Sequence, residues 1–114
     1  MHELSIVASL FEILEEKARE QKATKIFLVK LQVGKLAGVV PEFLVSAFDT
    51  YKEGTLAAEA VLEVEEVPVT IRCQKCGTES PSENFAFLCP SCGSSEIKIV
   101  SGTELLLERI ELEG

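Results

Sequence analysis

The chain has 114 residues, of which 46% are hydrophobic and 26% are charged, and its formal net charge is −8. This composition is that of a folded globular protein, and no segment reaches the roughly eighteen apolar residues that a membrane-spanning helix needs. The acidic balance argues against nucleic-acid binding, because contacts to phosphates require a basic surface. We therefore expect a soluble single domain, with at most a small added module, that binds neither nucleic acid nor membrane.

The start of the chain argues against export. A signal peptide has a basic flank followed by an uninterrupted apolar run. Here Glu3 comes early, and Glu12, Glu15 and Glu16 interrupt the first apolar segment. We expect a cytoplasmic location, where cysteine thiols stay reduced.

The first predicted element is a helix from Glu3 to about Ala23. Its apolar residues recur at helical spacing. The main apolar stripe consists of Leu4, Val7, Ala8, Phe11, Leu14 and Ala18. A second apolar strip lies beside it and consists of Ile6, Leu10 and Ile13. Together the two are wider than contact with one sheet face requires. The extra width indicates either deep burial in the same domain or a surface for a partner protein.

The second predicted element is a strand. The stretch TKIFLVKLQVG, residues 24–34, alternates between apolar and polar side chains. The residues expected on its inner face are Phe27, Val29, Leu31 and Val33. Lys30 and Gln32 are expected on the other face, and Gly34 ends the strand.

A second helix is predicted from Pro41 to Lys52, with Gly54 as its stop. Proline suits the first helical position, where no N–H donor is needed. Two later segments, AEAVLEVEEVPVTIRC (residues 58–73) and TELLLERIELEG (residues 103–114), are predicted as strands, although the early leucines of the second segment leave a helix possible. The core-facing residues expected in these strands are Leu62 and Val64 in the first and Leu106, Ile110 and Leu112 in the second.

This order of elements predicts an α+β fold in which two helices pack on a small three-stranded mixed sheet. The last two strands can form a long hairpin, and a four-cysteine zinc-ribbon module is inserted between them. We assign residues 1–70 and 97–114 to the main domain and residues 71–96 to the inserted module.

The inserted module contains all the cysteines of the chain, in two CxxC motifs. CQKC supplies Cys73 and Cys76, CPSC supplies Cys89 and Cys92, and twelve residues separate the two pairs. This spacing is typical of four thiolates that bind one Zn²⁺ ion. Gly77 and Gly93 each follow the second cysteine, where such a turn favours a left-handed residue. Four thiolates fill the coordination shell of zinc, so we expect a structural metal rather than a catalytic one.

Other interpretations of the four cysteines remain open. Two disulfides are the first alternative, although a reducing cytoplasm disfavours them. A thioredoxin-type redox site would need a fold context that is not evident here. Four sulfurs would also accept iron, and a zinc ribbon alone does not identify a function.

His2 is the only histidine in the chain, and it stands beside the amino terminus. If Met1 is retained, the α-amine, the backbone nitrogen of His2 and its Nδ1 atom form adjacent chelate rings. The backbone nitrogen of Glu3 can supply a fourth donor. Four nitrogens in one plane suit Ni²⁺ or Cu²⁺ better than Zn²⁺. The alternative is an ordinary solvated side chain at a chain end.

The segments MHELS, VGKLAGVVPEFLVSAFD and the paired CxxC motifs together resemble the HypA/HybF family of hydrogenase nickel incorporation proteins. The resemblance covers essentially the whole chain in the same order. It implies a nickel metallochaperone for [NiFe]-hydrogenase maturation, with nickel as cargo and a separate structural zinc. The implied residues are Met1, His2 and Glu3 for nickel, and Cys73, Cys76, Cys89 and Cys92 for zinc. Some relatives have histidines beside their CxxC motifs, where this chain has Gly77 and Gly93, so the resemblance does not carry over a histidine-dependent link between the two sites.

The resemblance also implies two partners, a nickel-binding GTPase maturation factor and the [NiFe]-hydrogenase large subunit. The wide apolar strip on the first helix is our candidate for a partner surface. A homodimer is also considered, because long hairpins tipped by small modules can exchange between protomers. The competing hypothesis is a zinc-ribbon adaptor in which His2 has no role. We do not expect an enzyme, because one terminal histidine and a saturated zinc site provide no nucleophile and base.

Overall fold

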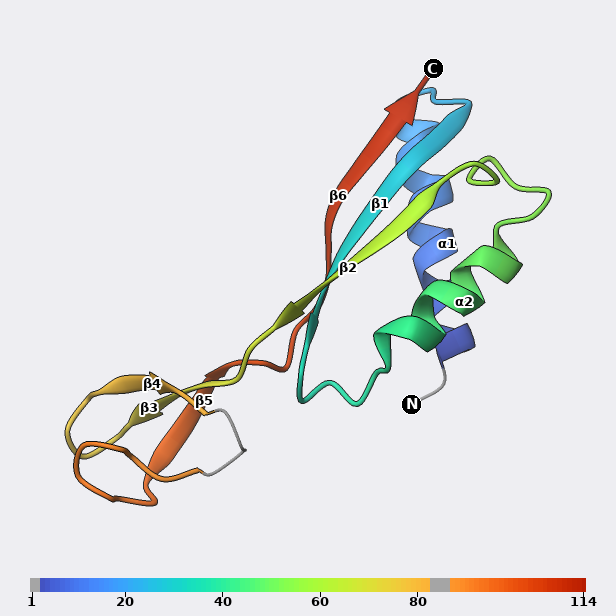
Figure 1. The fold of residues 1–114 in the computed structure, drawn as a ribbon. Helices are drawn as coiled ribbons and strands as arrows, with labels where there is room; N and C mark the ends of the chain where they lie inside the picture. The colour runs from blue at the N-terminus through green and yellow to red at the C-terminus, as the bar shows by residue number, and fades with distance from the viewer. Residues whose placement is uncertain (1–2, 83–86) are drawn as a thin grey trace.

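A computed structural model describes residues 3–82 and 87–114 (Figure 1). Its elements are α1 (Glu3–Glu20), β1 (Lys25–Gly34), α2 (Pro41–Tyr51), β2 (Val61–Val67), β3 (Thr70–Cys73), β4 (Glu79–Pro81), β5 (Ile97–Ser101) and β6 (Leu105–Glu113). The molecule is elongated, with extents of 54 × 25 × 17 Å. Both helices lie towards one end, and β3, β4 and β5 form the other. Within the described residues, no helix has the length and hydropathy to cross a membrane.

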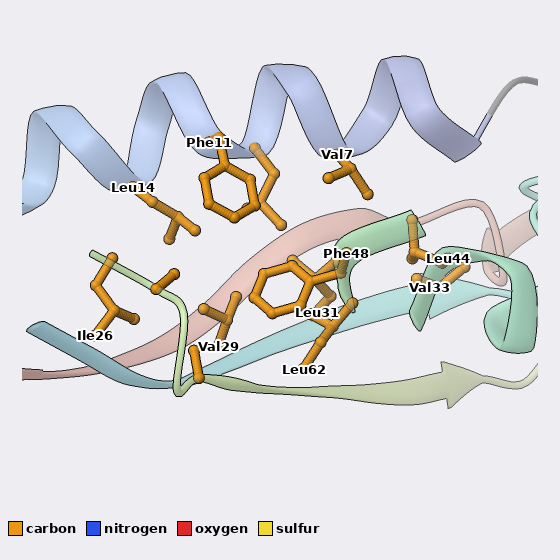
Figure 2. Packing of buried hydrophobic residues seen from close by; sticks show 13 residues of the cluster. Val7, Phe11, Leu14, Ile26, Val29, Leu31, Val33, Leu44, Phe48 and Leu62 are labelled. Atoms are coloured by element: carbon orange, nitrogen blue, oxygen red, sulfur yellow. The ribbon is translucent and has the colours of Figure 1, made fainter. Parts of the chain in front are cut away.

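Strand β1 is the centre of a three-stranded mixed sheet with the order β2-β1-β6. It pairs in parallel with β2 and antiparallel with β6. Helices α1 and α2 lie on the same face of this sheet (Figures 1 and 2). The predicted α+β fold is therefore confirmed. A second sheet, with the order β4-β3-β5, lies between β2 and β6 in the sequence.

The hydrophobic core fills the space between the two helices and the main sheet (Figure 2). Its larger members are Val7, Leu10, Phe11, Leu14, Ile26, Val29, Leu31, Val33, Leu44, Phe48 and Leu62. The ring of Phe11 lies between the helices, with its centroid 5.4 Å from that of Phe48 and 4.8 Å from that of Tyr51. This aromatic contact packs the last part of α2 against the middle of α1.

The predicted core face of α1 is partly wrong. Leu10 is buried, whereas Leu4 is exposed and Ala8 is only partly buried. The helix also ends at Glu20 rather than near Ala23. Leu10 belongs to the additional apolar strip of Ile6, Leu10 and Ile13. The helix α1 is therefore rotated about its axis so that this strip lies closer to the core than predicted.

Two strand faces are also corrected. Ile26 is buried instead of Phe27, which is 38% exposed, because the β1–β6 register shifts between Ile26 and Leu28. In β6, Leu107 packs on the core and Leu106 is 54% exposed. A second register shift in the β1–β6 ladder, next to Lys30, accompanies this change. Each shift inserts a bulge, which reverses the alternation of faces beyond it.

The predicted long hairpin is wrong in the main sheet, because β2 and β6 lie on opposite sides of β1. The predicted single strand over residues 58–73 is divided at Pro68 into β2 and β3, since proline offers no N–H to a strand ladder. Among the residues that the structure describes, the two segments of the predicted hairpin pair antiparallel only between β3 and β5. The division into residues 1–70 with 97–114 and residues 71–96 stays a prediction.

The end of β1 holds together the two segments that lead to the second sheet. The N–H of Lys35 donates to the carbonyl of Val67 at 3.0 Å, and the N–H of Leu36 donates to that of Gly102 at 2.7 Å. A Cβ atom placed on Gly34 would lie 2.1 Å from the carbonyl carbon of Gly102. The chains approach so closely here that only glycine fits at position 34.

Candidate metal sites

The four cysteines converge at the end of the second sheet. Their Sγ atoms all lie within 4.8 Å of one another. The Sγ atoms of Cys73 and Cys92 are 3.5 Å apart, as are those of Cys76 and Cys89. Four sulfurs bound tetrahedrally at about 2.3 Å from a zinc ion would be about 3.8 Å apart. The cluster therefore has the size that one tetrahedral ion requires.

Both CxxC segments form the same backbone turn. In each turn the glycine N–H donates to the carbonyl of the first cysteine, from Gly77 to Cys73 at 2.9 Å and from Gly93 to Cys89 at 2.8 Å. The two glycines have φ angles of 76° and 73°, which confirms the predicted left-handed conformation. The turns therefore present their cysteines in equivalent ways from two directions.

Each turn has one buried thiol and one thiol exposed to solvent. Cys73 and Cys89 are buried, whereas Cys76 and Cys92 are exposed. The Sγ atom of Cys73 lies 3.4 Å from the backbone nitrogens of both Lys75 and Cys76. These N–H groups stabilise a thiolate, so the buried sulfur is prepared to bind a cation.

The thiols have different proton affinities. The hydrogen bond between Cys76 Sγ and Thr78 Oγ1, which lie 3.2 Å apart, is the main cause that lowers the pKa of Cys76 to about 6. For Cys92, the backbone of Ser94 lowers the pKa, but hydrogen bonding with Cys73 and partial desolvation of the otherwise exposed thiol outweigh it and raise the pKa to about 11. The backbone N–H of Cys76 lowers the pKa of Cys73. At neutral pH the metal-free cluster therefore holds both thiolate and thiol.

The chemistry of this cluster is that of a closed site. All four cysteines are free thiols, and their 3.5 Å sulfur separations exceed the roughly 2.05 Å of a disulfide bond. Four sulfur ligands would leave no open position on a zinc ion for water or substrate. The donor set therefore fits a structural zinc ion.

Of the three residues predicted to bind nickel, Met1 and His2 lie outside the described residues. Glu3 is the first residue of α1, and its Oε2 atom accepts a hydrogen bond from the backbone N–H of Val40 at 3.4 Å. Val40 is the N-cap of α2 and provides no side-chain cap. The Glu3 carboxylate thus links the start of α1 to the start of α2. This link lies with the helices, away from the β3–β5 region that carries the cysteines (Figure 1).

Sequence reasoning missed two residues that shape these sites. Thr78 lowers the pKa of Cys76 through its hydroxyl group. The sequence indicates this contact only by placing a hydroxyl residue two positions after a cysteine. Val40 contacts Glu3 through its backbone alone. No side-chain pattern signals a contact of that kind.

The chain matches the family model described as "HypA: Hydrogenase/urease nickel incorporation, metallochaperone, hypA" over residues 1–112. It is 45% identical over 113 residues to the hydrogenase maturation factor HypA of Aquifex aeolicus, covering 99% of this chain and 98% of that protein. It is also 45% identical over 113 residues to the HypA of Moorella thermoacetica, covering 99% of this chain and all of that protein.

Solved structures agree with these relatives. The solution structure of the Ni metallochaperone HypA from Helicobacter pylori superposes with a TM-score of 0.70 at 30% identity, covering 99% of this chain and 98% of that one. A second structure, described as the solution structure of HypA protein, gives a TM-score of 0.74 at 32% identity, covering 98% and 96%. The chain therefore belongs to the HypA family of nickel metallochaperones that serve hydrogenase maturation.

Proposed function

We propose that this protein binds Ni²⁺ through Met1, His2 and Glu3 and delivers it to the large subunit of a [NiFe]-hydrogenase. The observation that carries the proposal is membership of a nickel-incorporation family across residues 1–112, which include the Met-His-Glu start. By the same resemblance, a nickel-binding GTPase supplies the metal. The metal is cargo, so the protein carries out no catalytic step of its own.

The start of α1 is chemically suited to such a site. The first four N–H groups of a helix have no acceptor within the helix, and Glu3 is the first helical residue. Its backbone nitrogen can therefore lose a proton and bind nickel without breaking a helical hydrogen bond. Its carboxylate interacts with the N–H of Val40, so the side chain anchors the terminus and the backbone supplies the donor.

The proposed site also allows release. The α-amine titrates near pH 8 and an imidazole near pH 6.5 in model compounds, so protons compete with nickel at each donor. A chelate at a chain end can give up its donors one after another as an acceptor protein replaces them. Nickel affinity is therefore expected to fall steeply below neutral pH.

We further propose that Cys73, Cys76, Cys89 and Cys92 hold a structural zinc ion. Within the described part of residues 68–102, the buried aliphatic side chains are Val69 and Ile71. Two such side chains form too small a core to stabilise a second sheet alone. Bound zinc would cross-link the two CxxC turns and supply much of the missing folding energy. Thiolate ligands also need a reducing environment, which suits the cytoplasm that we propose as the location.

Nickel titration of four proteins tests the terminal site. Calorimetry should detect tight binding to the untagged protein, and none of that binding in His2→Ala or in a version with one residue added before Met1. The variant Glu3→Gln is the matched control, because it keeps the backbone nitrogen and should still bind. Equal binding by all of these proteins would refute the terminal site, and little binding by any of them would favour the adaptor hypothesis.

A further inference from the structure

An apolar groove lies between α1 and β6, outside both metal sites. Its volume is about 420 Å³. Its walls include Ile6, Leu10 and Ile13 of α1, and Leu105, Leu106 and Leu107 of β6. The three α1 residues form the strip that makes this helix more apolar than its contact with the sheet requires. Leu10 contributes to the core, while Ile13 and Leu106 remain exposed. The residues of the strip that are not buried in the core, Ile6 and Ile13, therefore line the groove.

The groove opens beside a free strand edge. Strand β6 is the last strand in the order β2-β1-β6, and within the described residues only β1 pairs with it. It has nine residues and contains no proline. Its outer edge therefore offers a row of N–H and C=O groups that another strand can pair with. Because Leu105–Leu107 lie in both β6 and the groove wall, the edge and the groove form one continuous surface.

The shape of this surface fits an extended peptide. A strand added to β6 would direct alternate side chains towards α1. Ser5 and Ser9 of α1 also line the groove, and these small side chains leave space for the residues that enter. Leu105 and Leu107 are two residues apart, which is about 6.6 Å along a strand. Two aliphatic side chains at positions i and i+2 of the added strand would therefore enter together.

The negative charge near the groove favours a positively charged segment as its ligand. Glu12 and Glu16 follow the groove residues Ser9 and Ile13 by three positions, so they lie on the same side of α1. Both are exposed, and neither forms an ion pair with a described residue. The whole chain carries a net charge of −8. A second copy of this acidic chain is disfavoured by repulsion, whereas a basic segment is attracted.

We propose that the α1–β6 groove binds an extended segment of a partner protein that pairs with the free edge of β6. The segment carries aliphatic side chains at two alternate positions, which enter the groove, and lysine or arginine at the next alternate positions on the same face, towards Glu12 and Glu16. The proposal rests on the proposed function only in that a metallochaperone must dock on the proteins that supply or receive its metal. The described residues that line the groove include no histidine, cysteine or carboxylate, so peptide binding and nickel binding are separable.

The probe is a synthetic peptide with leucine at positions i and i+2, lysine at positions i−2 and i+4 of the same face, and threonine at the positions between them. Its fluorescein-labelled form is titrated with the full-length protein, and binding is followed by fluorescence anisotropy. Two control peptides have the same length: one carries N-methyl groups along one edge and cannot complete the strand pairing, and the other has glutamate in place of lysine. Hydrogen exchange of the β6 amides provides a site-specific readout.

The protein variants are matched in exposure. Leu106→Lys changes a groove residue that is 54% exposed, and Val61→Lys changes a residue that is 58% exposed on β2, the opposite edge strand. We expect Leu106→Lys to weaken peptide binding at least about tenfold, or about 1.4 kcal/mol, and Val61→Lys to leave it unchanged. Ile13→Lys alters the other wall and should act like Leu106→Lys. Glu16→Lys should weaken binding and reduce its dependence on salt.

Protection of β6 amides by the leucine–lysine peptide, lost with both control peptides, would support the proposal. Equal binding to the Leu106→Lys and Val61→Lys variants would overturn it, and so would equal binding of the N-methylated peptide. Concentration-dependent protection of β6 without peptide would overturn it too, by showing that a second copy is the occupant. Nickel titration of Leu106→Lys distinguishes the two proposals, because unchanged nickel binding with lost peptide binding separates the groove from the metal site.

Discussion

The substitution Gly34→Ala should weaken the junction between the two sheets. Gly34 ends β1, where a Cβ atom would lie 2.1 Å from the carbonyl carbon and oxygen of Gly102 and 2.5 Å from the nitrogen of Thr103. All three contacts are with backbone atoms, which cannot turn away as a flexible side chain can. Normal contact at about 3.5 Å would require the segment at Gly102 to move by more than about 1 Å.

The loss in the free energy of unfolding can be estimated from this movement. Forced overpacking costs about 1–3 kcal/mol. The hydrogen bonds from Leu36 to Gly102 and from Gly34 to Glu104, both 2.7 Å long, are worth about 1 kcal/mol each when they are lost. The lower entropy of the unfolded alanine chain offsets about 0.4–1 kcal/mol. We expect a net loss of about 2–4 kcal/mol in the free energy of unfolding, and a melting temperature lower by roughly 8–16 °C.

Gly38→Ala is the matched control. Gly38 has a φ angle of 74°, and beyond its chain neighbours a Cβ atom placed there would meet no described residue within 4 Å. Alanine at this position therefore adds only the left-handed strain of about 1 kcal/mol. Urea unfolding followed by circular dichroism measures both variants. A Gly34→Ala protein at least as stable as Gly38→Ala would refute the close approach at the junction.

Two further substitutions test the core and the cysteine cluster. Phe48→Ala removes a fully buried ring and should cost about 3–5 kcal/mol in urea unfolding, whereas Phe43→Ala, at a residue 62% exposed on the same helix, should change stability by less than about 0.5 kcal/mol. Equal effects would contradict the orientation of α2. Thr78→Val removes the hydroxyl beside Cys76 and should raise the pKa of that thiol in the metal-free protein. Ultraviolet thiolate absorbance follows the titration, and an unchanged pKa would assign the shift to the backbone.

The sequence predicted the element types and the cysteine cluster better than the strand registers. Both errors in strand faces occur where large apolar residues are adjacent, at Ile26–Phe27 and at Leu105–Leu107. Period-two alternation cannot select a face in such a run, and the bulges that decide it depend on pairing between distant strands. The cysteine spacing, by contrast, defines a local turn whose hydrogen bonds form within a few residues.

The long-hairpin prediction failed for a topological reason. Helix α2 connects β1 to β2, and a helical crossover normally joins parallel neighbours in one sheet. That signal was available from the order of elements alone, and it places β2 beside β1 and not beside β6. The Glu3–Val40 contact had no such signal, because it depends on how α1 and α2 pack.

The unequal thiols also predict how zinc binding depends on pH. Binding converts all four cysteines to thiolates, and it releases a proton only from those that are still protonated. With the pKa of Cys76 lowered to about 6 and that of Cys92 raised to about 11, Cys76 is mostly ionised at pH 7 and Cys92 is not. Zinc should therefore release fewer than four protons at pH 7, and the number should rise as the pH falls through 6. A pH-indicator titration in weak buffer counts these protons, and a release of four at pH 7 would contradict the role of Thr78 at Cys76.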